Sequence, residues 1–459
     1  MNDEQGDMGA QHNPEDPMAK WFAQFSGGAG GEFDLQKMIA QLQQAMSSMA
    51  GQPQPAGIDW NQAKQAARQV VAGLGADPSP TARDQQQVFE ADRLAALWLD
   101  PHLAFSSLAS QPVAWSRAEW VEKTMDSWRT VAEPIVTRIA DALAASFEQQ
   151  FDISENVPAE FAQFGSMLTP ILRTSAGPLY ALQLSQAIGK IAGQVVSGSE
   201  IGLQLLPSPQ VVLLPANVSE FAQGLGLSDD DVRLYLTVRE GARQRLFASV
   251  GWLGPQMLAL LEHYAREITI DVGAISDALD VGDMSSMTPQ RMAELSHQLQ
   301  GKLFSPTQTE TQAEILGRLE TLLALVEGWV DEVAANTISA WMPHAAELLA
   351  EAVRRRRATN NPSQQLFKEL VGLEMRPRRV RDAANMWAAL TNDRGVAGRD
   401  AVWAHPDLMP TEADLDDPLR LTDPAHAEPA ADEMDLALAE LLAQAEAERR
   451  AEPDEDANG

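Results

Sequence analysis

The chain has 459 residues, of which 45% are hydrophobic, and it carries a formal net charge of −31. This length is sufficient for a large hydrophobic core, whereas the negative charge disfavours general binding to nucleic acids or anionic membranes because it repels phosphate. The sequence contains no cysteine, which excludes disulfide bonds and thiolate chemistry. The acidic start does not resemble a secretory leader, and no apolar run reaches the ~18 residues of a membrane span, so we expect a cytoplasmic protein.

Composition divides the chain into three parts. Residues 1–56 are rich in Gly, Gln, Met and Pro and cannot bury enough surface to offset the entropy of ordering, so we predict a disordered tail. Residues 57–410 have the apolar spacing of a helical domain. Residues 411–459 are acidic and are predicted to be mostly disordered. Within them, the leucines of 434–450 have helical spacing, which is typical either of a solvated tail, the commoner case, or of a docking helix.

The central part is predicted to be helical almost throughout. Apolar residues recur at intervals of three and four in 58–74, 84–100, 116–147 and 177–198. Ser116 followed by Glu119 is a capping-box pattern, which predicts the start of a helix. The short run at 211–215 is rich in β-branched residues and predicts a strand. The sequence therefore predicts a mainly α protein.

A further helix, predicted at 228–253, carries the most informative polar residues. Ser228 is a suitable N-cap, and the three aspartates after it complement the helix dipole. Arg239 and Arg243 lie four residues apart and therefore share a helix face, with Glu240 beside them. A charged strip on so apolar a helix indicates either a functional site or a buried ion network.

Three long stretches of the chain resemble one known family. They are VVLLPANVSEFAQGLGLSDDDVRLYLTVREGARQRLF, then LETLLALVEGWVDEV, then LFKELVGLEMRPRRVRDAANMWAALTNDRGVAGRDAVWAHPDLMPTEADLDDP. Over about 58–419 the chain resembles the actinobacterial zincin-like metallopeptidases, a family of hydrolases in which some members are labelled as associated with deazaflavin-coenzyme biosynthesis. The resemblance implies a zincin-like helical domain and zinc-dependent peptide hydrolysis.

The residues at the motif depart from what zinc requires. In zincins, two histidines one helical turn apart bind the metal, and the glutamate after the first is the general base. By the resemblance, Glu240 occupies the general-base position, whereas Arg239 and Arg243 occupy the ligand positions. Arginine stays protonated near pH 7 and has no lone pair to offer a metal. Glu327 matches a downstream carboxylate ligand, and Trp329 stands where some relatives have histidine.

Several interpretations of these residues remain open. We favour a buried network in which Glu240 and Glu327 pair with Arg239 or Arg243. On that interpretation no metal cofactor is expected, and the chain acts as a non-catalytic binding protein for a protein or peptide. The alternative is an active zinc-dependent hydrolase whose ligands are distant in sequence, such as His263 with Glu240 and Glu327. A third is a non-hydrolytic ligand site in the same cleft. By itself, His263 is more commonly a partly buried helix residue than a metal ligand.

A basic island interrupts the acidic sequence near its C-terminal end. Three interpretations are open: a patch for phosphate or nucleic acid, a docking site for the acidic tail, or a solvated helix end with salt bridges. We favour the solvated helix end. Few aromatic residues accompany it, which disfavours single-strand binding by stacking, so nucleic acid is not an expected partner. The candidate binding residues are Arg354, Arg355, Arg356, Arg357, Arg378 and Arg379.

Overall fold

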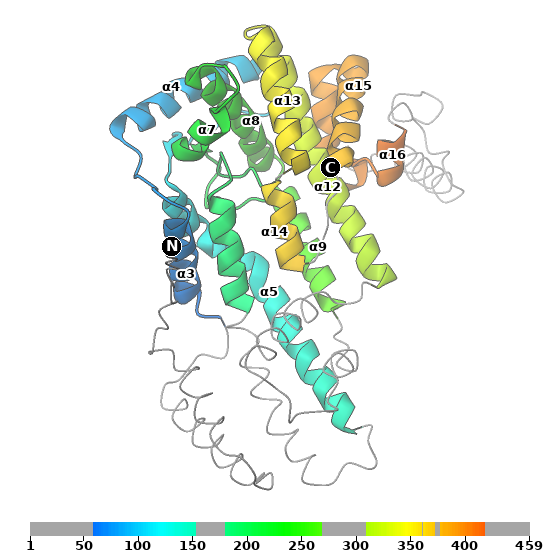
Figure 1. The fold of residues 1–459 in the computed structure, drawn as a ribbon. Coiled ribbons are helices and arrows are strands. Elements are labelled where there is room, and N and C mark those ends of the chain that lie inside the picture. The colour runs from blue at the N-terminus through cyan, green and yellow to red at the C-terminus, as the bar shows by residue number, and fades with distance from the viewer. Residues whose placement is uncertain (1–57, 153–179, 269–308, 360, 372–376, 418–459) are drawn as a thin grey trace, which may run out of the picture. The chain divides into compact units, whose positions relative to one another are not determined.

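The computed structural model describes residues 58–152, 180–268, 309–359, 361–371 and 377–417. All of these residues belong to one compact unit, whose elements Figure 1 colours in chain order. The tail predicted at 1–56 and the leucine-rich stretch 434–450 lie outside the described residues.

The unit is built almost entirely of helices, which confirms the predicted fold class. Its first half contains α3 (Trp60–Gly73), α4 (Ala82–Leu99), η1 (Asp100–His102), β1 (Val113–Ala114), α5 (Arg117–Asp152), β2 (Val212–Leu213), α7 (Pro215–Ala222), α8 (Asp229–Ser249) and α9 (Leu253–Arg266). Residues 180–192 are also helical. Its second half contains α12 (Glu310–Ser339), α13 (Pro343–Thr359), α14 (Pro362–Val371), α15 (Pro377–Ala401), η3 (Val402–Ala404), η4 (Pro406–Leu408) and α16 (Glu412–Asp416).

Local sequence determines where the two longest helices begin. Ser116 and Glu119 form the predicted capping box before α5, because Glu119 N donates to Ser116 Oγ at 3.1 Å and Ser116 N donates to Glu119 Oε2 at 2.8 Å. Thr309 and Gln312 make the same reciprocal pair before α12, at 3.0 and 3.1 Å. In both cases two backbone N–H groups that no helix turn can satisfy gain side-chain acceptors.

The predicted strand at 211–215 is present but shorter than expected. Only Val212 and Leu213 form β2, which pairs in parallel with β1 so that Val113 lies opposite Val212. Pro215 has no backbone N–H to add to a ladder and instead begins α7. Periodicity gave no sign of β1, because a two-residue strand has no pattern to detect.

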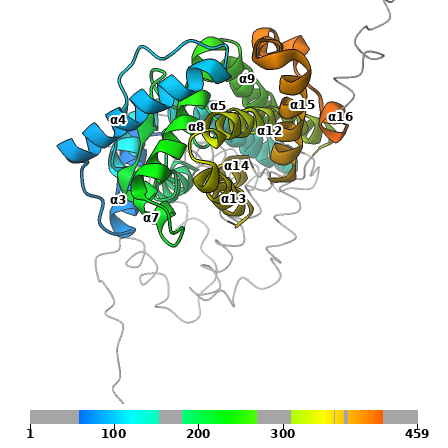
Figure 2. The ribbon, with the colours of Figure 1, turned by 90° about the horizontal axis from the view of Figure 1, so that it is seen from above.

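Helices α8 and α12 form the centre of the described unit. α12 packs against α8, α9, α13 and α15, while α8 also packs against α4 and α7, as the view in Figure 2 makes clear. Gly328 allows α12 and α15 to approach closely, since an added Cβ would lie 2.6 Å from Ala383 Cβ and 2.7 Å from Ala384 N. Residues 234–247 of α8 are all buried, so the polar groups on this helix lie inside the protein.

Candidate functional site

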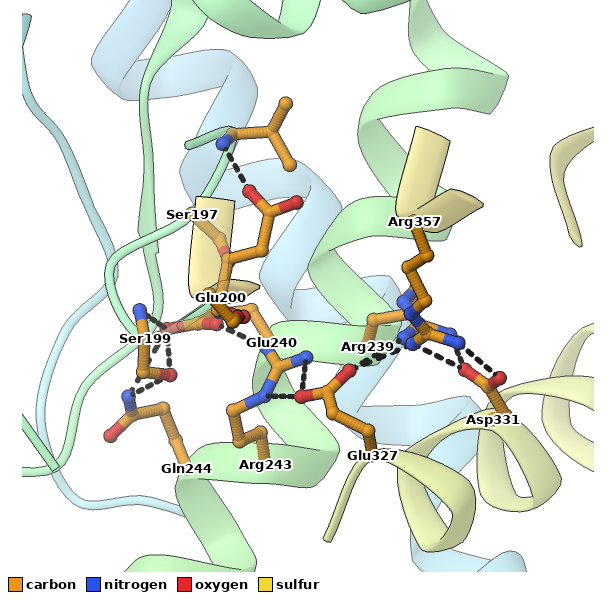
Figure 3. A network of polar contacts seen from close by, with 12 residues as sticks. Ser197, Ser199, Glu200, Arg239, Glu240, Arg243, Gln244, Glu327, Asp331 and Arg357 are labelled. Carbon is orange, nitrogen blue, oxygen red and sulfur yellow. Dashed lines mark hydrogen bonds and ion pairs between the residues drawn. The ribbon is translucent and has the colours of Figure 1, made fainter. Parts of the chain in front are cut away.

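Helix α8 carries the arginine and glutamate motif into the interior. Ser228 Oγ accepts a hydrogen bond from Asp231 N at 3.1 Å and caps the helix as its sequence predicts. Arg239, Glu240 and Arg243 are 6%, 0% and 2% exposed. Their side chains meet residues of α12, α13 and the loop that follows residue 195, in the network of polar contacts drawn in Figure 3.

The carboxylate of Glu240 is fully occupied by hydrogen-bond donors. Its Oε2 accepts from Ser197 Oγ at 2.8 Å and from Arg243 Nη1 at 2.9 Å. Its Oε1 accepts from the hydroxyl and backbone N–H of Ser199 at 2.9 and 3.2 Å, and from Gln244 Nε2 at 3.1 Å. A carboxylate has about four lone-pair positions. Glu240 therefore has no free position for a water or a metal unless one of these contacts breaks.

Arg243 connects Glu240 to helix α12. Its Nη1 donates to Glu240 as described, while its Nε and Nη2 lie 2.9 and 2.7 Å from Glu327 Oε1. The guanidinium is thus a fork between two carboxylates, a geometry that arginine makes well because its donors are planar and fixed. A neutral histidine at this position has a single N–H to donate and could not serve both carboxylates at once.

Further ion pairs of the same network link α8, α12 and α13. Asp331, one helical turn after Glu327, accepts from Arg239 and from Arg357, whose Nη1 lies 2.6 Å from its Oδ2. Arg357 Nη2 also lies 2.7 Å from Glu327 Oε2. Three guanidinium groups are therefore matched by three carboxylates. We call this set the central ion network: Arg239, Arg243, Arg357, Glu240, Glu327 and Asp331.

In the central ion network, nearby opposite charges outweigh the effect of burial on the pKa of two carboxyl groups. Burial by itself would raise the pKa of Asp331, but Arg357 and Arg239 outweigh it and hold that pKa below its usual range. The pKa of Glu327 is likewise lowered, because Arg243, Arg357 and Arg239 together exceed the effect of burial. Glu327 and Asp331 therefore stay ionised inside the protein, as an ion network requires.

A small cavity of about 50 Å³ borders the central ion network. Beside it, Arg356 Nη1 pairs with Glu200 Oε1 at 3.1 Å, and Val196 N donates to Glu200 Oε2 at 2.6 Å. A cavity of this size holds a few water molecules but no peptide. Its polar lining includes Ser197, Glu200, Arg239, Arg243, Arg356 and Ser363.

The residues present do not fit a zinc ion. The two ligand positions of the motif hold Arg239 and Arg243, whose charge repels a dication, and the carboxylate of Glu240 is saturated. Within the described ranges, no three His, Asp or Glu residues form a group that could hold a metal.

The histidine of the alternative interpretation is not brought to the motif. His263 is an exposed residue of α9, whereas Glu240 has no accessible surface, so the structure does not join the two. Trp329 is also fully buried, and its Nε1 donates to Asp400 Oδ1 at 2.9 Å. Its indole therefore joins α12 to α15.

The basic island does not form one surface patch. Arg356 and Arg357 turn inward, to Glu200 and to the central ion network, so they are not available to a phosphate as the patch interpretation required. Arg354 pairs with Glu351 of its own helix at 3.0 Å, and Arg355 is exposed. The side chain of Arg378 lies outside the described part.

Arg379 makes an intramolecular contact that the tail-docking interpretation anticipated. It pairs with Glu412 and Asp416, which lie in α16 at the start of the segment assigned to the acidic tail. The first residues of that segment are therefore helical and attached to α15, rather than disordered.

No role was predicted from the sequence for five residues of the site, one of which is Gln244, one helical turn after Glu240. Asp331 carried a usable signal, because it lies four residues after Glu327 on the same helix face. Ser197, Ser199 and Glu200 carried none, since they lie in an irregular loop about 40 residues before the motif. The predicted pairing of Glu240 and Glu327 with the motif arginines is present.

Comparisons with known proteins agree with this fold. The family model described as zincin-like metallopeptidase matches residues 58–421. A crystal structure from Chloroflexus aurantiacus, described as that of "a putative hydrolase with a novel fold", is similar with a TM-score of 0.53 and 18% identity, over 79% of this chain and 96% of that one. No curated protein matches. None of the described helices is long and apolar enough to cross a membrane.

The fold and the buried motif together define a helical, hydrolase-like domain. The chain belongs to the zincin-like metallopeptidase family, since the family model covers most of its length. The likeness to the Chloroflexus protein, at 18% identity, supports the fold alone.

Proposed function

We propose that this chain is a non-catalytic member of its family, which acts by binding a protein or peptide partner. The observation that carries the proposal is the fork of Arg243 between Glu240 and Glu327, in a network where each carboxylate is already occupied. A general base needs a lone pair directed at a water, and a zinc ion needs ligand atoms whose lone pairs are free. Neither condition holds at Glu240 as it is bonded here.

The cytoplasm is the proposed location, which agrees with the absence of cysteine. An actinobacterial source and a connection with deazaflavin-coenzyme biosynthesis are expectations from the family resemblance, and no residue of the site supports the latter.

The test is the metal content and the peptidase activity of the purified, untagged chain. After exhaustive dialysis, we expect far less than one zinc per chain by mass spectrometry, and no peptide hydrolysis that depends on added zinc. About one zinc per chain, with turnover that Glu240→Gln abolishes, would overturn the proposal. The metal content of the wild-type chain decides even if that variant fails to fold.

A further inference from the structure

A second hollow lies apart from the central ion network, between α9, α12 and residues 406–412. Its volume is about 560 Å³, within the range of sites that hold ligands or peptide side chains. Most of its lining is apolar, although it opens to solvent, and we call it the α9–α12 groove. Its apolar lining includes Trp252, Leu260, Leu322, Leu325, Pro406 and Met409.

The wall that α12 contributes has open space in front of it. An added Cβ at Gly317 would meet nothing within 4 Å, unlike one at Gly328 on the same helix. Arg318 beside it is exposed and forms no ion pair with any other residue in the described ranges. Glu314, one helical turn before Arg318, is exposed in the same wall and offsets its charge, so it is the apolar lining that suits the groove to the apolar face of an amphipathic segment.

The last described helix, α16, begins at the edge of this groove. Glu412 lines the groove and is the first residue of α16, which Arg379 holds through Glu412 and Asp416. From Asp417 to Met434 there are about 17 residues, which can span up to roughly 55 Å when extended. The stretch of α12 that lines the groove, from Ala313 to Leu325, covers 13 residues, or about 20 Å. Every part of the groove is therefore within reach of residue 434.

The segment 434–450 has the pattern that such a groove selects. Met434, Leu438, Leu441 and Ala445 follow one another at intervals of four, three and four, which places them on one helix face. The remaining positions are mixed: Asp435, Glu440, Glu446 and Glu448 are acidic, Arg449 and Arg450 are basic, and most of the others are Ala or Leu. A helix of 17 residues is about 25 Å long, enough to cover the α12 wall.

We propose that residues 434–450 dock as an amphipathic helix in the α9–α12 groove of the same chain. Tethering gives such a segment an effective concentration in the millimolar range, so a modest apolar contact is sufficient to keep it bound. The groove is then a regulated surface: a partner that uses it must displace the tail. This inference concerns a different surface from the central ion network and does not depend on whether the chain hydrolyses peptides.

The absence of native cysteine makes a site-specific crosslink a direct test. Gln256 is exposed on α9 and borders the groove, so Gln256→Cys in the full chain provides a single thiol for a photoactivatable crosslinker. We expect mass spectrometry to locate the crosslinks in 434–450, in a product that migrates as one chain. Crosslinks to other segments only, products that join two chains, or no tail crosslink would each overturn the proposal.

Two further variants separate specific docking from chance contact. Gly317→Glu places a carboxylate at the open groove, where the added Cβ meets no atom within 4 Å, and we expect it to reduce the yield of the tail crosslink roughly tenfold or more. The matched control is Gly73→Glu at the end of α3, where an added Cβ likewise meets no atom within 4 Å. It should leave the yield of the crosslink unchanged. Leu438→Ser with Leu441→Ser should reproduce the loss and speed the reaction of the Gln256→Cys thiol with a water-soluble reagent. Equal yields in all variants would contradict docking.

Discussion

Arg243 is a buried residue of α8 whose guanidinium pairs with two carboxylates. Its side chain is 2% exposed and is the one contact that joins Glu240 to Glu327. Removing one member of a buried ion network leaves the opposite charge uncompensated, which is more costly than the intact network is stabilising. Arg243 is therefore a structural element of the fold, whatever else the motif does.

We predict that Arg243→Met lowers the free energy of unfolding by about 3–5 kcal/mol, measured by urea denaturation at pH 7. Methionine keeps the apolar part of the side chain, so the loss reports the charge. Arg129→Met is the control, because Arg129 pairs with Glu133 on an exposed helix face and should contribute less than about 1 kcal/mol. Similar losses in the two variants would show that the network does not stabilise the fold.

Asp92 on α4 is a carboxyl group that burial penalises. Its pKa is raised from 3.8 to about 6 by desolvation, against which the charge of Arg245 acts only in part. The folded state thus holds the proton more tightly than the unfolded state. Asp92 therefore favours folding below pH ~4, and this contribution is lost as the pH rises through about 6.

Replacement of Asp92 should for this reason have an effect that depends on pH. We predict that Asp92→Asn raises the free energy of unfolding by about 1–2 kcal/mol at pH 7.5, less than the full pKa shift would give because the group is only partly buried. Near pH ~3 the effect should vanish, since the carboxyl group is then mostly neutral in both the folded and the unfolded state. Urea denaturation at the two pH values measures the difference, and an equal gain at both would rule out this cause.

At the scale of elements, α12 organises the fold through two glycines with opposite surroundings. Gly328 faces α15 at a distance that leaves no room for a methyl group, whereas Gly317 faces open space. We predict that Gly328→Ala lowers the free energy of unfolding by about 1–3 kcal/mol because α12 and α15 must separate. Gly317→Ala on the same helix is the matched control and should be neutral or stabilising by up to about 1 kcal/mol. The thermal midpoints of the two variants should therefore move in opposite directions.

Helix α13 carries four consecutive arginines whose side chains have different surroundings. Arg354 and Arg355 face outward, while Arg356 and Arg357 reach Glu200 and the central ion network. Four consecutive residues cover all sides of a helix, so a basic run on a packed helix cannot form one patch. Local composition alone does not contain this information.

At the scale of the whole molecule, net charge and the burial of these arginines act together against nucleic-acid binding. With a formal charge of −31 and its inward arginines already paired, the full chain should not bind a single-stranded oligonucleotide at 150 mM salt. Fluorescence anisotropy of a labelled oligonucleotide measures this. Micromolar binding that weakens steeply with added salt would show that a basic surface remains available.

The sequence by itself determined the helical class, the helix starts at Ser116 and Ser228, and the departure of the motif from a zinc site. These features depend on neighbours within a few residues: apolar spacing, capping side chains, and the absence of a lone pair on arginine. Family membership also followed from the sequence, because long stretches carry the resemblance.

The groups that surround Glu240 and the carboxylates that the arginines bind depend on contacts between segments far apart in the sequence. Ser197 and Ser199 reach Glu240 from a loop some 40 residues away, and Arg357 reaches Asp331 from another helix. The α9–α12 groove likewise joins residues of α9 and α12 to the segment before α16. Such contacts depend on how helices pack against one another, and side-chain spacing within a segment carries no record of which distant segment it will meet.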